Sequence, residues 1–151
     1  NFNKMSQVTH KTAIRMKAAG FPQPEAAFAQ VWYDEDGDPL VVVDVNEKWP
    51  KDDGGVFQLV WMGVPGNGGA IFETNNDEMG DWCFAPTVSD ILPLLGDNAI
   101  IKFRKDETGQ IWECNIDEGD GRERLLGYHE TSAAEAAAMA WLKLNENADR
   151  P

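Results

Sequence analysis

The sequence has 151 residues, 42% of them hydrophobic and including six Trp and seven Phe, which excludes an intrinsically disordered chain and suits one domain over residues 1–151. Acidic residues outnumber basic ones by 26 to 13, giving a net charge of −13, and this excess of carboxylates argues against nucleic acid as a partner. No apolar run approaches the roughly 18 residues that indicate a membrane-spanning helix, so no membrane association is expected.

The chain begins with a predicted helix that Ser6 or Thr9 caps and that runs to about Ala19. Gly20 follows at the position where a helix commonly ends in a glycine. The segment 21–24 contains two prolines, which lack a backbone N–H, so the helix is expected to stop there.

Two β-hairpins are predicted, because in each case two strand-like segments flank a short polar turn. Further strands are expected outside these hairpins, where apolar side chains alternate or cluster between glycine-rich or charged loops. The first hairpin joins 27–33 to 40–45 around the acidic turn 34–38, the second joins 99–104 to 110–116, and the further strands are 56–62, 70–73 and 125–129.

Two more helices are predicted from their capping residues. Thr87 is a favourable N-cap for a short helix that ends at Gly96, and Ser132 with Glu135 forms a capping box that opens an Ala-rich helix at 133–145. Tight hairpins imply antiparallel pairing. The expected fold class is therefore α+β: one antiparallel sheet of about five to seven strands, with an N-terminal, a short central and a C-terminal helix packed on it.

Three segments carry a resemblance to a known group of proteins: AAGFPQPEAAFAQVWYDEDG, APTVSDILPLLG and TSAAEAAAMAWLKL. Together they resemble small proteins encoded in bacteriophage and prophage genomes of gut-type bacteria, in which a helix, a GFPQP-like break and a WYD hairpin precede an APT helix and an Ala-rich A-x-x-WL helix. The resemblance spans most of the chain. It implies an intracellular, phage-linked accessory protein and brings no reaction with it.

Three segments resemble metal- or phosphate-binding motifs but lack residues that those motifs require. The run Asp34, Asp36, Asp38 differs from a calcium-binding EF-hand loop, because its glycine is fourth rather than sixth and its twelfth residue is Val45. It is interpreted as a polar hairpin tip, and 117–121 fails the same test. The glycine-rich segment 63–69 is not followed by the Lys that a phosphate-binding loop needs. No metal and no cofactor are therefore expected.

Catalytic residues are not predicted at any position. Glu113, between Trp112 and Cys114 on an expected strand, is the acid most suited to a raised pKa, but an inward Trp112 turns Glu113 outward to solvent. The two histidines, His10 and His129, stand apart from any matched nucleophile. An enzyme is thus the less favoured class.

The cysteines and two tryptophans bear on location and binding. Cys83 and Cys114 are interpreted as buried free thiols in a reducing compartment, which favours the cytoplasm of a bacterial host. Trp49 and Trp82 stand in predicted loops beside acids, as interaction hot spots often do. The alternative is that each Trp folds back onto the core.

Charge distribution supports the functional prediction. The segment 25–99 holds fifteen acids and two bases, whereas residues 1–24 hold four bases and no acid. We expect a non-catalytic protein that binds a macromolecular partner, such as a host factor, with a basic surface. The expected binding region is 25–99. The alternatives are a protein that sequesters a nucleotide-like or saccharide ligand and a carboxylate-dependent hydrolase. The expected partner-binding residues are Trp49, Glu73, Asp77, Glu78, Asp81 and Trp82.

Overall fold

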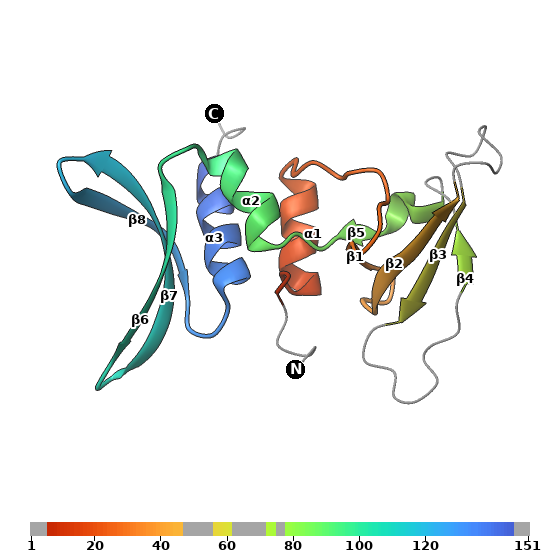
Figure 1. Ribbon diagram of the computed structural model, residues 1–151, viewed down its shortest axis with the longest axis horizontal. Coiled ribbons are helices and arrows are strands. Elements are labelled where there is room, and N and C mark those ends of the chain that lie inside the picture. Colours follow the sequence, from red (N-terminus) through yellow and green to blue (C-terminus); the bar gives the residue numbers. More distant parts are fainter. Residues whose placement is uncertain (1–5, 47–55, 62–71, 75–77, 147–151) are drawn as a thin grey trace. The chain divides into compact units, whose positions relative to one another are not determined.

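The computed structural model describes residues 6–46, 56–61, 72–74 and 78–146, and the chain divides into two compact units (Figure 1). Unit 1 comprises Asn1–Asn3 and Pro22–Ala85, and unit 2 comprises Lys4–Phe21 and Pro86–Pro151. In the sequence, most of unit 1 is therefore an insertion between two segments of unit 2. The single domain expected over 1–151 stays a prediction, because a division into two compact units does not show whether they fold together.

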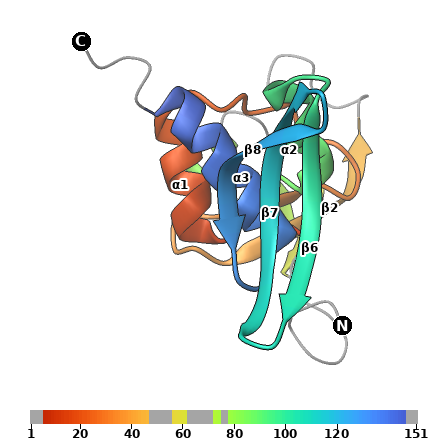
Figure 2. The same ribbon diagram turned by 90° about the vertical axis from the view of Figure 1, so that its left-hand side faces the viewer.

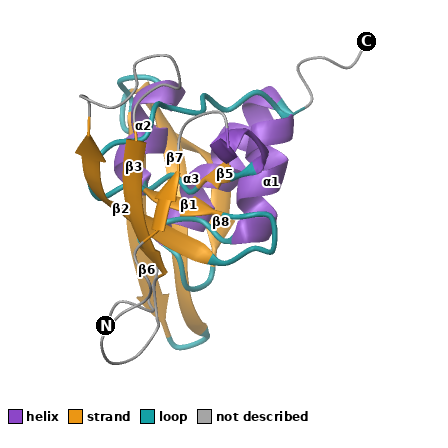
Figure 3. Cartoon of the chain, turned by 90° about the vertical axis from the view of Figure 1, so that its right-hand side faces the viewer, coloured by secondary structure: helices purple, strands orange, loops and turns teal. Residues whose placement is uncertain are grey.

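The part of unit 1 that the structure describes contains one five-stranded sheet in which every strand pair is antiparallel (Figure 3). The strands lie in the order β4-β3-β2-β1-β5, and a short 3₁₀ helix, η2, precedes β5. Trp32 contacts Phe84 of the neighbouring strand with ring centroids 5.4 Å apart, so aromatic packing joins β1 to β5. The bounds are β1 Val31–Tyr33, β2 Pro39–Asn46, β3 Val56–Trp61, β4 Phe72–Thr74, η2 Glu78–Asp81 and β5 Cys83–Phe84.

The predicted first hairpin is present, but its first strand is shorter than expected. Residues 27–30 form a turn instead of continuing β1, since the Gln30 N–H donates to the Ala27 carbonyl at 3.1 Å. Ala29 adopts the left-handed conformation, with φ of 71°. The apolar alternation of 27–33 predicted a strand throughout, and it is wrong for the first four residues because alternation alone does not show a left-handed residue.

The described residues of unit 2 contain the helices α1, α2 and α3 and a three-stranded antiparallel sheet in the order β6-β7-β8 (Figure 2). Helix α3 packs against all three strands of this sheet, and α1 and α2 pack against α3. Thr9, rather than Ser6, is the N-cap of α1. The bounds are α1 His10–Ala18, α2 Val88–Leu95, β6 Ala99–Asp106, β7 Gly109–Gly119, β8 Arg122–His129 and α3 Ala133–Asn145.

The α+β class is confirmed, but the expected single sheet of five to seven strands is wrong for the described residues, which form two sheets. A hairpin turn fixes which strands are neighbours only within that hairpin. Strand β5 pairs back with β1, and helix α2 then intervenes before β6 begins. Nothing in the alternation of apolar residues distinguishes this arrangement from one continuous sheet.

Candidate functional site

The acidic charge is concentrated in unit 1. Its residues include thirteen acids and two bases, a net charge of −11, whereas unit 2 has thirteen acids and eleven bases, a net charge of −2. The predicted acidic region 25–99 thus corresponds largely to unit 1, although Asp90 and Asp97 belong to unit 2. The two units therefore differ strongly in how they attract charged partners.

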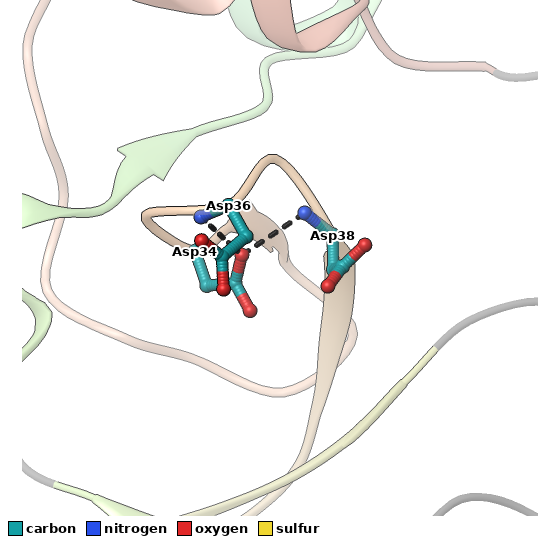
Figure 4. A group of neighbouring side chains, drawn as sticks. All are labelled: Asp34, Asp36 and Asp38. Atoms are coloured by element: carbon teal, nitrogen blue, oxygen red, sulfur yellow. Dashed lines mark hydrogen bonds between the residues drawn. The ribbon is translucent and has the colours of Figure 1, made fainter.

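Three aspartates gather at the tip of the hairpin between β1 and β2 (Figure 4). Asp34 shapes the tip, because its Oδ1 accepts hydrogen bonds from the backbone N–H groups of Asp36, at 2.9 Å, and Asp38, at 3.0 Å. The three carboxylates offer oxygens that all lie within 4.8 Å of one another, and Asp36 and Asp38 are exposed. The tip combines a hydrogen-bonded turn, as the sequence indicated, with a local concentration of negative charge.

The predicted partner-binding residues do not form one described surface. Trp49 and Asp77 lie outside the described residues. The backbone of Glu73 belongs to β4 and that of Glu78 to η2. Asp81 is exposed.

Trp82 is only 8% exposed, and its N–H donates to the Met79 carbonyl at 2.9 Å. An anchor for a partner needs an accessible ring before binding. For Trp82, burial therefore favours the alternative in which the loop Trp packs onto the core.

Phe28 is an exposed aromatic residue that the sequence did not single out. Its side chain is 73% exposed on the turn 27–30. Gln30 rigidifies this turn, because its Oε1 accepts from the Ala27 N–H at 2.8 Å and from Trp32 Nε1 at 3.1 Å. The Ala29 N–H also donates to the Val42 carbonyl at 2.8 Å. Unit 1 thus holds an aromatic side chain in solvent on a turn with several hydrogen bonds.

Glu113, the acid considered for catalysis, lies on the sheet face opposite Cys114, which packs with Leu126 and Ala140 of the core. The outward orientation is as expected, but the solvated environment is wrong: Glu113 is 9% exposed. Arg104 Nη1 donates to Glu113 Oε2 at 2.9 Å. Glu113 therefore contacts a guanidinium group, whereas a general acid needs an apolar pocket.

The remaining titratable candidates have structural roles. His129 Nδ1 accepts from the Thr131 N–H at 3.2 Å and the Ser132 N–H at 3.1 Å, so it orders the segment before α3. Cys83 and Cys114 are buried free thiols, as expected. Burial raises the pKa of Cys114 to about 11, which keeps it protonated and unreactive at neutral pH.

A cavity of about 490 Å³ opens on the outer face of the β6-β7-β8 sheet, which is the face opposite Cys114 and helix α3. Its lining includes Arg104 and Glu113, the apolar Ile111, and Glu130 from the segment after β8. Asp106 also lines the cavity, and its carboxylate accepts hydrogen bonds from the Thr108 hydroxyl at 2.5 Å and the Thr108 N–H at 2.8 Å. These hydrogen bonds lower the pKa of Asp106 and keep it ionised.

Comparison with known proteins gives no relative: the chain matches no protein-family model, no curated protein and no solved structure. Among the described residues, no helix has both the length and the apolar composition needed to cross a membrane.

Proposed function

We propose that this chain is a non-catalytic accessory protein, of the kind encoded by bacteriophage and prophage genomes, that binds a macromolecular partner with a basic surface through unit 1. The observation that carries the proposal is the segregation of charge, with −11 in unit 1 and −2 in unit 2. Such a field accelerates the encounter with a basic protein and disfavours acidic ones.

Two described features of unit 1 support a protein partner in particular. The exposed carboxylates of Asp36 and Asp38 provide concentrated charge at a turn whose backbone is fixed by Asp34. The exposed ring of Phe28 provides apolar area, which interfaces need in addition to charge. Both turns are ordered by hydrogen bonds before binding, and this reduces the entropy lost in association.

Salt-dependent capture tests the proposal. The tagged full chain is incubated with a lysate of the native host at low and high ionic strength, and bound proteins are quantified by mass spectrometry. We expect a basic protein that is retained at low salt and released at high salt, because exposed charges are screened. The double variant Asp36→Asn with Asp38→Asn should retain less of it.

The matched control neutralises two exposed acids of unit 2, in the double variant Asp97→Asn with Glu107→Gln. It changes the net charge by the same amount and should leave capture nearly unchanged. Retention that is insensitive to salt, or equally reduced in both double variants, contradicts binding through unit 1.

A further inference from the structure

Across the outer face of the β6-β7-β8 sheet, the cavity contains a row of three different chemical groups. Arg104 of β6 pairs with Ile111 of β7, and the Trp112–His129 pair places Ile111 next to Glu130 just beyond the end of β8. All three residues line the cavity. The row therefore consists of a cation, an apolar side chain and an anion. The Cα atoms of Arg104 and Glu130 are about 10 Å apart, because they are separated by two strand spacings.

The cationic end of the row is held in place and still accessible. Arg104 donates from Nη1 to Glu113, whose side chain is 12% exposed, while the Arg104 side chain is 63% exposed. A guanidinium group has five N–H donors in a planar fork. The ion pair with the more buried Glu113 thus fixes the orientation of Arg104 and leaves further donors for a carboxylate ligand.

At the anionic end, Glu130 is exposed and lies in the same cavity as Thr131. Among the described residues, no ion pair joins Glu130 to a basic side chain, whereas the Glu113, Glu118, Glu123 and Glu146 carboxylates are all paired. Arg104 and Glu130 line the cavity on opposite sides of Ile111, and no ion pair joins these two described residues. An ammonium group placed beside Glu130 would gain a charge-assisted hydrogen bond.

From this row we infer that the cavity in unit 2 binds a small ω-amino acid: the ligand's carboxylate contacts Arg104, its methylene chain lies over Ile111, and its ammonium group contacts Glu130. The lining residues of this site all belong to unit 2, and the inference does not depend on the function proposed for unit 1. Because both charged walls are open to solvent, the affinity is weak, in the millimolar range.

Three probes of similar size separate the contributions of the two charges. The ¹⁵N-labelled full chain is titrated with γ-aminobutyrate, n-butylamine or butyrate, and amide shifts are followed by NMR. We expect saturable shifts at 104–113 and 130–131 with γ-aminobutyrate. Each single-charge probe should bind about three- to fivefold more weakly, because it loses one contact with a solvent-exposed charge. Equal binding of all three probes, or no saturable shift in this region, would overturn the inference.

Variants locate the contacts. Glu130→Gln should weaken γ-aminobutyrate binding by about three- to fivefold while leaving the Arg104–Glu113 ion pair intact, so loss of folding does not explain the effect. Arg104→Gln should weaken it similarly. The matched control is Arg124→Gln, which removes an exposed Arg that pairs with Glu118 on the same sheet outside the cavity. An undiminished affinity in Glu130→Gln contradicts the assignment.

Discussion

Gly127 determines how closely helix α3 approaches strand β8. A Cβ atom at this position would lie 2.5 Å from the Ala136 carbonyl oxygen and would also collide with the Ala140 backbone nitrogen. Both neighbours belong to the backbone of α3, so neither yields by a side-chain rotation. The buried alanines of α3 complete this contact, because their small side chains let the helix backbone rest on the sheet.

Replacing Gly127 by alanine should destabilise unit 2. The added methyl group pushes α3 away from β8, and overpacking of this kind costs about 1–3 kcal/mol. Urea unfolding followed by circular dichroism measures the change. Gly80→Ala is the control, since a Cβ there meets no atom within 4 Å. Equal midpoints for the two variants would show that α3 has room to move.

At this scale, the sequence predicted helix caps better than side-chain environments. Thr9, Thr87 and Ser132 all precede helices, because capping depends on residues within one turn of each other. The burial of Glu113 was missed, since the sequence of one strand does not show which side chains of the neighbouring strands, Arg104 among them, lie against it. The exposure of Phe28 was missed as well, because it depends on the left-handed conformation of Ala29.

At the scale of elements, helices α1 and α3 are joined by the buried carboxylate of Glu135. Glu135 is 6% exposed and accepts from the Thr12 hydroxyl at 2.6 Å and the Thr9 N–H at 3.1 Å. Only half of the predicted capping box exists: Ser132 Oγ accepts from the Glu135 N–H, but the Glu135 carboxylate reaches α1 and not Ser132. Local spacing predicted the cap correctly. The Glu135 side chain instead binds Thr12, which is 123 residues away in the sequence.

Glu135→Gln should therefore loosen α1 from α3. An amide has one acceptor oxygen, so it accepts from the Thr9 N–H only if its NH₂ group turns to the Thr12 hydroxyl, which must then accept instead of donate. Both buried hydrogen bonds also lose the charge of the carboxylate, which together costs about 1–3 kcal/mol. Thermal unfolding of this variant is compared with that of Glu107→Gln, an exposed glutamate of the β6-β7 turn. A midpoint no lower than in the Glu107 variant refutes the role given to Glu135.

For the whole molecule, the decisive feature is the insertion of the acidic residues 22–85 into unit 2. The two segments of unit 2 meet through the Val8 N–H, which donates to the Pro86 carbonyl at 3.0 Å, and through the Gln7–Thr87 bridge. Pairings between residues so distant in the sequence have no local signal. The hairpins were predictable for the opposite reason, since each is specified within about twenty residues.

Deleting the acidic insertion tests the central claim most directly. Residues 22–85 are replaced by a flexible Gly/Ser linker of about ten residues, and the folding of the remaining unit is verified by circular dichroism and amide NMR. Both this variant and the full chain are then used for capture from host lysate over a salt series. The account predicts that the full chain retains a basic protein in a salt-dependent manner and that the folded deletion variant retains none of it. Equal retention of that protein by the deletion variant would contradict partner binding through unit 1.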